Sequence, residues 1–451
     1  MTDHDHVHDE LRRLAETGQF EQFSALAADV HPSDVSDVLA TLADDLRLRL
    51  VESLPPEIVS EALAEMEEEE HPEEILAAVE PEIAADIVEE LDDDDAADLI
   101  ADLSKEAASR ILSEVETEER AEIERLLTYD EETAGGLMTA HVVVVSEQAT
   151  AGAAIEEIRR QAEEIGDFYQ VFCVDDRHRL LGTLPLQRVV VASPSALVRD
   201  IMEPLPVVAT PDLDQEEVAR LMSRYNVPSM PVVDSTGKLL GRVTFDDVID
   251  VVEAEQTEDL LMFGGGSADE LLAGEWYQAV RHRLPWLYLN LFTAFFAAAV
   301  VLLFEETIGQ LVILAAVMPV VAGLGGSAGT QALAVTVRRI ALGLIPKGTG
   351  VHLVGKEMLV GLVNGLAIGI VVGMVMVVMG RGWELGLVVT CAMWGSLMVA
   401  ATVGAAVPLI LERLGVDPAV ASSGFVTAVT DIAGFFLLLG LAAWLLLPAG
   451  S

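Results

Sequence analysis

The spacing of hydrophobic positions changes twice along this chain, and each spacing predicts a different kind of element. Between residues 31 and 130, apolar side chains recur every 12 residues. The breaks between units carry acids or proline, as at Pro56 and Pro81, which suit a first helical turn. Short helices that cannot bury a face alone must stack, so we expect a helical-repeat domain for sensing or interaction. The period is seen at Val79, Leu91, Leu103, Val115 and Leu127, and again at Ile87, Leu99, Ile111 and Ile123.

Residues 1–30 precede the repeat and predict a polar N-terminal tail and a first helix. His4, His6 and His8 offer imidazoles for a metal, but a frayed polar terminus is the interpretation we favour.

A mixed pattern of strands and helices follows in two copies, residues 136–197 and 198–254. Each copy predicts the order strand, helix, strand, turn, strand, helix. The copies are aligned by Leu137-Met138 with Ile201-Met202, by Val174-Asp175 with Val233-Asp234, and by Gly182 with Gly241.

A strongly acidic helix is predicted over Asp246 to Leu261, within a linking segment of residues 246–280. Asp246, Asp250 and Glu253 share one face of this helix, where like charges repel unless water or a bound cation neutralises them. Both interpretations remain open. The run Phe263 to Gly266 predicts a flexible joint.

Residues 285–451 are dominated by long apolar runs that predict five membrane-spanning helices. Basic residues gather between the second and third runs, and Glu305 and Glu306 lie between the first and second. The positive-inside rule then predicts a multi-pass protein of the cell membrane, with its amino-terminal half cytoplasmic and its carboxyl end outside. The runs are Trp286–Phe304, Ile308–Gln331, Val360–Met379, Leu385–Leu411 and Ser422–Leu447.

The second run contains a glycine-rich stretch, residues 323–329, which we expect to break the helix. Irregular backbone at membrane depth is tolerated where it lines a cavity, whereas small residues also let helices pack closely. The neighbouring hydroxyl and amide groups favour pore lining over close packing. The candidate pore-lining residues are Gly325, Gly326, Ser327, Thr330 and Gln331.

The fifth run carries one ionisable residue, Asp431. A carboxylate inside a membrane span is costly unless it faces a polar path, so Asp431 is the first candidate for ion binding, with Thr427 one turn away. The alternative is that Asp431 lies near the interface or bonds neighbouring hydroxyls.

Charge is distributed very unevenly along the chain. The net charge is −48, yet from Pro285 onward there are only seven acids and six bases. The intensely acidic front part repels nucleic acid and anionic lipid and attracts divalent cations. Adaptation to a high-salt cytoplasm would explain many of the same charges. Cys173 and Cys391 lie in different halves and predict no disulfide, which fits a reducing cytoplasm.

The duplicated region resembles a tandem pair of cystathionine-β-synthase (CBS) domains. In that family a Gly-x-x-Thr-x-x-Asp segment contacts the phosphate and ribose of an adenine nucleotide. The second copy matches it with Gly241, Thr244 and Asp247, so the resemblance implies ATP as a possible ligand. The first copy has Pro185 and Arg188 at the matching positions, so at most one site is intact, and a purely structural pair is the alternative.

The order of parts resembles the MgtE family of magnesium transporters. The most specific stretches are Thr133–Thr139, Gly325–Gln331, Asp417–Ser422 and Thr427–Asp431, although Ser327 stands where the family usually has Asn. We therefore expect a multidomain α-helical membrane protein: a cytoplasmic helical-repeat domain, tandem CBS domains of α+β type, and five transmembrane helices.

The resemblance implies a Mg²⁺-selective channel without enzymatic activity. It implies a homodimer in which Asp431 of each subunit faces a shared pore and binds hydrated Mg²⁺. Few carboxylates are needed, because Mg²⁺ retains most of its water.

The resemblance also implies closure by cytoplasmic Mg²⁺, which would bridge the acidic domains and bring the linking helix to the pore. The matching positions are Asp94, Asp95 and Asp98 in the repeat domain, and Asp246, Asp247, Asp250, Glu255, Glu258 and Asp259 on the linking helix.

Three alternatives use the same residues differently. A transporter of Co²⁺ or Mn²⁺ is disfavoured because no Cys or His lies near Asp431 in its span. An aspartyl hydrolase needs two carboxylates in one site. A membrane-anchored Mg²⁺ or nucleotide sensor without transport would leave the polar residues within the spans unexplained.

Overall fold

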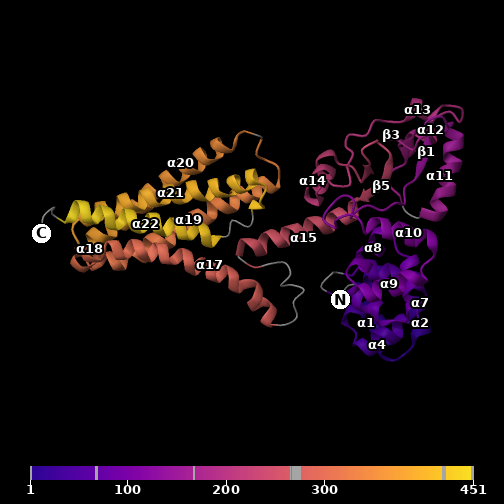
Figure 1. The fold of residues 1–451 in the computed structure, drawn as a ribbon, viewed down its shortest axis with the longest axis horizontal. Coiled ribbons are helices and arrows are strands. Elements are labelled where there is room, and N and C mark those ends of the chain that lie inside the picture. The colour runs from indigo at the N-terminus through magenta and orange to yellow at the C-terminus, as the bar shows by residue number, and fades with distance from the viewer. Residues whose placement is uncertain are drawn as a thin grey trace. The chain divides into compact units, whose positions relative to one another are not determined.

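The computed structural model describes residues 3–66, 70–165, 168–264, 266, 276–346, 348–418 and 423–447. The chain forms two compact units, Met1–Glu253 and Ala254–Ser451 (Figure 1).

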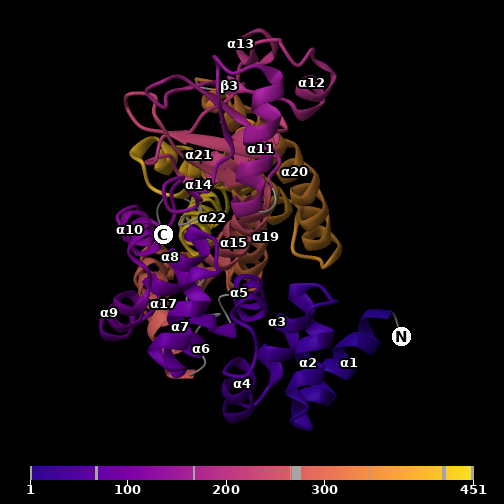
Figure 2. The same cartoon turned by 90° about the vertical axis from the view of Figure 1, so that its right-hand side faces the viewer.

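The first unit begins with a series of short helices that follow one another from the amino terminus (Figure 2). Proline occupies the first turn of four of them, as expected for a residue that has no N–H to donate. These helices are α1 (Asp3–Glu16), α2 (Phe20–Ala27), α3 (Pro32–Thr41), α4 (Asp44–Val51), α5 (Pro56–Ala64), α6 (Pro72–Ala78), α7 (Pro81–Glu89), α8 (Asp93–Ala101), α9 (Lys105–Glu114) and α10 (Thr117–Leu126).

The period-12 positions form the core of this helical array. Both series are buried, except that Leu127, just after α10, is 37% exposed. The amino terminus differs from the expected frayed tail, because α1 begins at Asp3 and buries Leu11 and Leu14 in the same core. Residues 3–30 therefore extend the repeat domain.

The CBS copies each build a small sheet covered by helices. In the first copy β1 (Val144–Ser146) pairs in parallel with β2 (Phe172–Val174), which pairs antiparallel with β3 (Leu180–Thr183). In the second copy β4 (Ser229–Val233) and β5 (Leu239–Thr244) are antiparallel. The expected first strand of the second copy is reduced to Ala209, which bridges to Val232. The helices are α11 (Ala151–Ile165), α12 (Leu186–Val191), α13 (Val198–Ile201) and α14 (Gln215–Tyr225).

The two copies are joined by reciprocal backbone pairing. Thr139, near the start of the first copy, pairs with Arg242 of β5, and Glu203, near the start of the second, pairs with Thr183 of β3. A Cβ on Gly182 would lie 2.4 Å from the Glu203 carbonyl oxygen, and one on Gly241 would lie 2.5 Å from that of Thr139. Both glycines are thus required by packing, with or without a nucleotide.

The linking helix, α15 (Phe245–Gly264), starts in the first unit and ends in the second. It includes Phe263 and Gly264, so the helix continues into the expected joint. Of the rest of that joint, Gly265 lies outside the described residues.

Within the described part of the second unit, five helices are long and apolar enough to cross a membrane, which confirms the predicted spans. The first four are longer than the predicted apolar runs, and the first contains Pro285. They are α17 (Trp276–Leu303), α19 (Ile313–Ala341), α20 (Gly350–Val378), α21 (Trp383–Leu414) and α22 (Ser423–Leu446), with a short α18 (Glu305–Gln310) after the first.

The expected break in the second span is wrong, because α19 is continuous through the glycine-rich stretch. These glycines allow neighbouring helices to approach. A Cβ on Gly329 would lie 2.7 Å from Val426 Cγ1 of α22, and one on Gly404 of α21 would lie 2.3 Å from the Gly329 carbonyl oxygen. Close packing, the alternative interpretation, explains why the helix persists.

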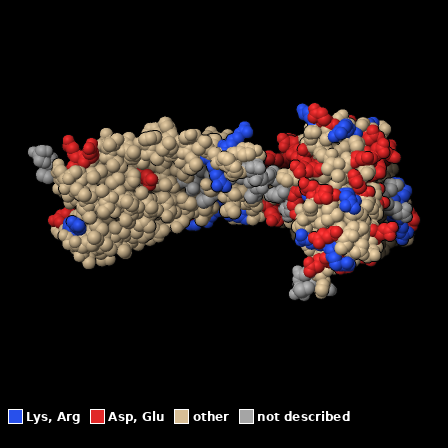
Figure 3. Space-filling view, turned by 90° about the horizontal axis from the view of Figure 1, so that it is seen from below, with Lys and Arg blue, Asp and Glu red and all other residues tan. Residues whose placement is uncertain are grey.

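Charge separates the two units clearly (Figure 3). Acidic side chains crowd the first unit, whereas the middle of the helical bundle in the second is almost entirely uncharged. That surface suits a hydrocarbon environment.

Candidate functional site

An open pocket of about 630 Å³ lies between α19 and α22 in the membrane unit. From α19 it is lined by small and hydroxyl-bearing residues, and from α22 by Thr427 and Asp431. The full lining is Ala322, Gly323, Gly326, Ser327, Thr330, Thr427 and Asp431.

Asp431 supplies the only charge among the residues that line this pocket. One of its oxygens, Oδ1, is buried and has no hydrogen-bond partner among the described residues. The Ser327 hydroxyl donates to the Gly323 carbonyl 2.8 Å away, and its lone pairs remain available. The pocket therefore offers a carboxylate and several oxygen acceptors, a set that suits a hard cation or its water shell.

Two of the candidate pore residues lie elsewhere. Gly325 is buried, and its ideal Cβ position is 3.3 Å from Ser396 Oγ, so this residue serves helix packing. Gln331 is exposed and is not among the lining residues. Ala322 and Gly323 were missed, because an alanine and a glycine in an apolar run carry no chemical signal of their own.

A second candidate site gathers carboxylates in the first unit. Asp94, in the first turn of α8, is only 8% exposed, and its Oδ1 has no hydrogen-bond partner among the described residues. Burial raises the pKa of Asp94 and Asp95 well above the usual range, and the charge of Asp247 raises both further. Burial also raises the pKa of Asp247, to about 6. Carboxylates held together in this way favour either protons or a bound cation.

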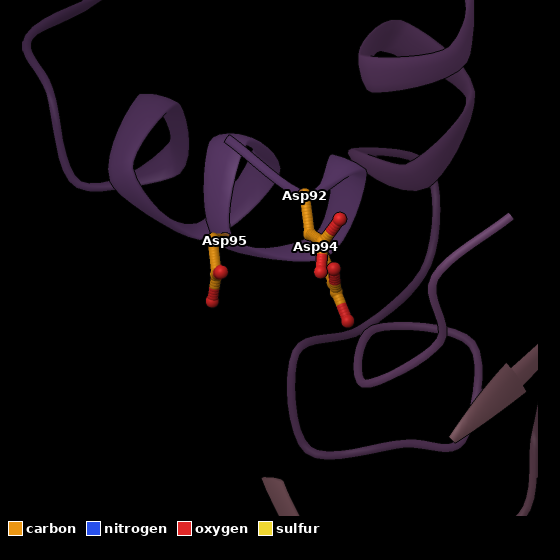
Figure 4. A group of neighbouring side chains, drawn as sticks. All are labelled: Asp92, Asp94 and Asp95. Atoms are coloured by element: carbon orange, nitrogen blue, oxygen red, sulfur yellow. The ribbon is translucent and has the colours of Figure 1, made fainter. Parts of the chain in front are cut away.

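Asp92 is a third carboxylate at the start of α8, which the sequence interpretation did not single out. Ligand atoms of Asp92, Asp94 and Asp95 all lie within 4.8 Å of one another. Figure 4 shows their side chains leaving the helix toward the same side. A run of four aspartates, Asp92 to Asp95, was visible in the sequence, but nothing there showed which of them face inward.

The other regulatory candidates are more scattered. Asp98 lines a separate small pocket of about 50 Å³ together with Glu131, which was also missed. Asp246 and Asp250 are exposed. Glu255 and Glu258 are half-buried on the part of α15 that belongs to the second unit. The side chain of Asp259 lies outside the described residues.

The candidate nucleotide residues bond to each other. The Thr244 hydroxyl donates to Asp247 Oδ2 at 2.5 Å, and the Thr244 backbone N–H donates to the same oxygen at 3.1 Å. In the first copy, Arg188 forms an ion pair with Glu203 where the second copy has its Thr–Asp pair. The two copies therefore differ in charge at the matched position.

These features define a class: a multi-span membrane protein with a polar pocket among its helices and an acidic unit that contains a CBS pair. The MgtE profile, described as a divalent cation transporter, matches residues 318–441. The MgtE intracellular N domain matches residues 30–132, and CBS domains match 134–194 and 198–254.

Characterised relatives agree with these matches. The magnesium transporter MgtE of Thermus thermophilus is 37% identical over 334 residues, which cover 72% of this chain and 73% of that protein. The magnesium transporter MgtE of Enterococcus faecalis is 33% identical over 71% of each chain. This chain belongs to the MgtE family.

Solved structures resemble the first unit. The soluble part of a magnesium transporter is 30% identical with a TM-score of 0.53, covering 56% of this chain and 99% of that one. The cytosolic domain of the Mg²⁺ channel MgtE in complex with ATP is 35% identical with a TM-score of 0.51, covering 54% of this chain and 99% of that one.

Proposed function

We propose that this chain is a Mg²⁺ channel for uptake across the cell membrane, closed by Mg²⁺ on its cytoplasmic side. The observation that carries the proposal is the pocket in which Asp431 meets Ser327, Thr330 and Thr427 among apolar helices. Mg²⁺ dehydrates reluctantly and is held through its waters by one or two carboxylates. Such binding attracts the ion and still releases it, as conduction requires.

The pore is completed by a second copy of the chain. The pocket is open on one side and contains a single carboxylate. In a symmetric dimer the same surface of each subunit meets across the axis, so two Asp431 side chains would share one hydrated ion. An odd number of spans supports opposite faces for the two termini, so with the amino-terminal unit inside we expect the carboxyl end outside.

Regulation follows from repulsion at the acidic site. The charge of Asp247 raises the pKa of both Asp94 and Asp95, so repulsion among these carboxylates favours separation when Mg²⁺ is scarce. Bound Mg²⁺ would hold the repeat domain against the CBS pair. In this proposal Asp98, Asp246, Asp250, Glu255, Glu258 and Asp259 add negative potential or further ligands.

The end of α15 supports a link between regulation and the pore. Within the second unit, Met262 packs against a cluster of Leu333, Val337 and Val426. Val426 directly precedes Thr427 of the pocket, so movement of α15 would reach the helix that carries Asp431. ATP at Thr244 and Asp247 is a further proposed ligand, and it would have to replace the hydrogen bonds between them.

Mg²⁺ uptake into sealed proteoliposomes tests the pore. We expect wild-type chain to admit Mg²⁺, Asp431→Asn to abolish entry at equal insertion, and Glu384→Gln to leave it unchanged, because exposed Glu384 lies at the start of α21 outside the pocket. Equal entry through wild type and Asp431→Asn would refute the pore assignment.

The same assay separates the alternatives. Faster entry of Co²⁺ or Mn²⁺ than of Mg²⁺ would identify a transition-metal transporter, although no Cys or His lines the described pocket. Mg²⁺ binding without entry of any divalent ion would identify a sensor.

A further inference from the structure

Asn290 is a polar residue midway along α17, and its side-chain amide lies against the start of α22. A Cβ on Gly424 would lie 2.7 Å from Asn290 Nδ2 and 2.8 Å from Asn290 Cγ, and Oδ1 would be closer still. Any side chain at position 424 would therefore meet this amide. Glycine there leaves the space that Asn290 fills, so the contact is specific to this pair.

Asn290 differs from its neighbours on α17 in the way it faces. Leu289, Phe292 and Phe295 are exposed, as apolar side chains in contact with lipid would be, whereas Asn290 is half-buried. An amide is costly in hydrocarbon, so polar side chains in spans turn toward other helices or toward a water-filled path. What Asn290 can do thus depends on the face of α22 that it meets.

That face of α22 is the one that carries the ion pocket. Gly424, Thr427 and Asp431 are spaced i, i+3 and i+7, so they lie along one side of the helix. Thr427 and Asp431 line the pocket. The amide on Gly424 therefore continues this row of polar groups, one turn beyond Thr427 and two turns, about 10 Å, from Asp431.

Asn290 lies on the cytoplasmic side of Asp431 in the proposed topology. Four spans precede α22, so α22 starts on the same side of the membrane as α17, the cytoplasmic side. An ion that leaves Asp431 toward the cytoplasm would pass the amide of Asn290. A neutral amide offers an oxygen to the waters of a hydrated ion and holds it less strongly than a carboxylate, which suits release.

We propose that Asn290 is a further ion-path residue, whose amide binds the water shell of Mg²⁺ on the cytoplasmic side of Asp431. The inference rests on the function proposed above, because it takes the pocket at Asp431 as the ion path. It adds α17 to the helices that form this path, since the pocket lining itself comes from α19 and α22.

Initial Mg²⁺ entry into proteoliposomes, measured over a range of Mg²⁺ concentrations at equal insertion, tests this inference. Asn290→Leu keeps the volume and removes the polar atoms, so we expect the half-saturating concentration to rise about fivefold, as for one lost hydrogen bond. Asn290→Asp adds a carboxylate and should lower both the half-saturating concentration and the maximal rate, because tighter binding slows release. Asn364→Leu, a change of an exposed asparagine on α20, should alter neither.

A merely structural role is distinguished by the same two quantities. If Asn290 only holds α17 against α22, both variants would lower the maximal rate and leave the half-saturating concentration unchanged. That result would overturn the proposal.

The reaction of introduced cysteines supplies a second readout that does not depend on flux. In a Cys173→Ala/Cys391→Ala background, which removes both native cysteines, Asn290→Cys should react with a small, charged, membrane-impermeant thiol reagent in the absence of Mg²⁺. Phe295→Cys on the same helix should not react, because Phe295 is 64% exposed and points away from Asn290. Equal reaction at the two positions would overturn the proposal.

Failure of the proposed function would look different. In that case the wild-type chain would admit no Mg²⁺, and the cysteine variants alone would decide the inference. Reaction at both Asp431→Cys and Asn290→Cys would keep the two residues in one water-filled path. An unreactive Asn290→Cys would overturn the inference, whether or not Asp431→Cys reacts.

Discussion

Asp247 accepts two hydrogen bonds from Thr244 while it faces the carboxylates of the repeat domain. Burial raises its pKa from an ordinary value near 3.8 to about 6. A carboxyl whose pKa is higher in the closed contact than in the open one favours closure when it is protonated. This contribution is fully present below the ordinary pKa near 3.8 and is lost as pH rises through the closed-state pKa of about 6.

We therefore expect protonation of Asp247 to favour the closed contact partly in place of bound Mg²⁺. Without divalent ions, lowering the pH from about 7.5 to about 5 should slow hydrogen exchange in α8, corrected for the intrinsic pH dependence of exchange. Asp247→Asn should weaken this response, because its amide stays neutral throughout, and exposed Asp37→Asn should not. A full response in Asp247→Asn would contradict the assignment.

Ser327 is the pocket hydroxyl whose role can be isolated most easily. Ser327→Ala removes an oxygen that faces the ion path and should lower Mg²⁺ entry about fivefold, as expected for one hydrogen bond. Thr336→Val is the matched control, because Thr336 also donates to a carbonyl four residues earlier on α19 but is buried away from the pocket. Equal losses in both variants would show that the effect is one of folding.

Single residues differed greatly in how well the sequence revealed them. Asp431 was identifiable because one acid in a long apolar run has few explanations. The contact of Asp92 and Asp93 with His141 was hidden, because the front part of the chain holds so many acids that position alone cannot select among them.

At the scale of elements, glycine determines how close the membrane helices approach. Gly361, Gly365, Gly369 and Gly373 lie along one face of α20, and a Cβ on any of them would come within 3.0 Å of α21. Thr390 of α21 donates its hydroxyl to the Gly369 carbonyl 3.0 Å away. This stripe fixes α21, which in turn packs against α19 and α22.

Gly361→Val should therefore destabilise the bundle by about 1–3 kcal/mol, because its Cβ would lie 2.6 Å from the Leu397 carbonyl oxygen. Gly355→Val on the same helix has no heavy atom within 4 Å and should be tolerated. Thermal unfolding in detergent measures both. Comparable midpoints for the two variants would contradict this packing.

The wrong expectation for span two has the same physical origin. A glycine-rich stretch is compatible with a broken helix and with a continuous helix that others approach closely. Which of the two forms is adopted depends on the neighbouring helices, and here Val426 of α22 and Gly404 of α21 pack against the glycine-rich stretch of α19. Hydrophobic spacing predicted the spans and the repeat helices well, because burial has the same period as the element.

At the scale of the whole molecule, we expect Mg²⁺, the ion that the chain is proposed to conduct, to stabilise the acidic first unit. A ligand at about a hundredfold its dissociation constant stabilises the state that binds it by about 2.7 kcal/mol. Chelation of Mg²⁺ should thus lower the first thermal transition of the full chain, whereas a monovalent salt of equal ionic strength should not restore it fully. Full restoration by that salt would indicate charge screening without a Mg²⁺ site.

The order of parts, from repeat domain through CBS pair to five spans, was predictable because each has its own hydrophobic spacing. Reciprocal pairing between the CBS copies was not, because it joins residues such as Thr139 and Arg242 that are far apart in the chain. Those contacts fix where the carboxylates of α8 and α15 meet.

The most direct test of the account is Mg²⁺ flux through the reconstituted wild-type chain as the Mg²⁺ concentration on the cytoplasmic face is raised. If Mg²⁺ is both the conducted ion and the regulator, flux should fall as cytoplasmic Mg²⁺ accumulates. The double variant Asp94→Asn/Asp247→Asn should change the Mg²⁺ concentration at which this fall occurs. Flux that stays constant or rises with cytoplasmic Mg²⁺ would contradict the account.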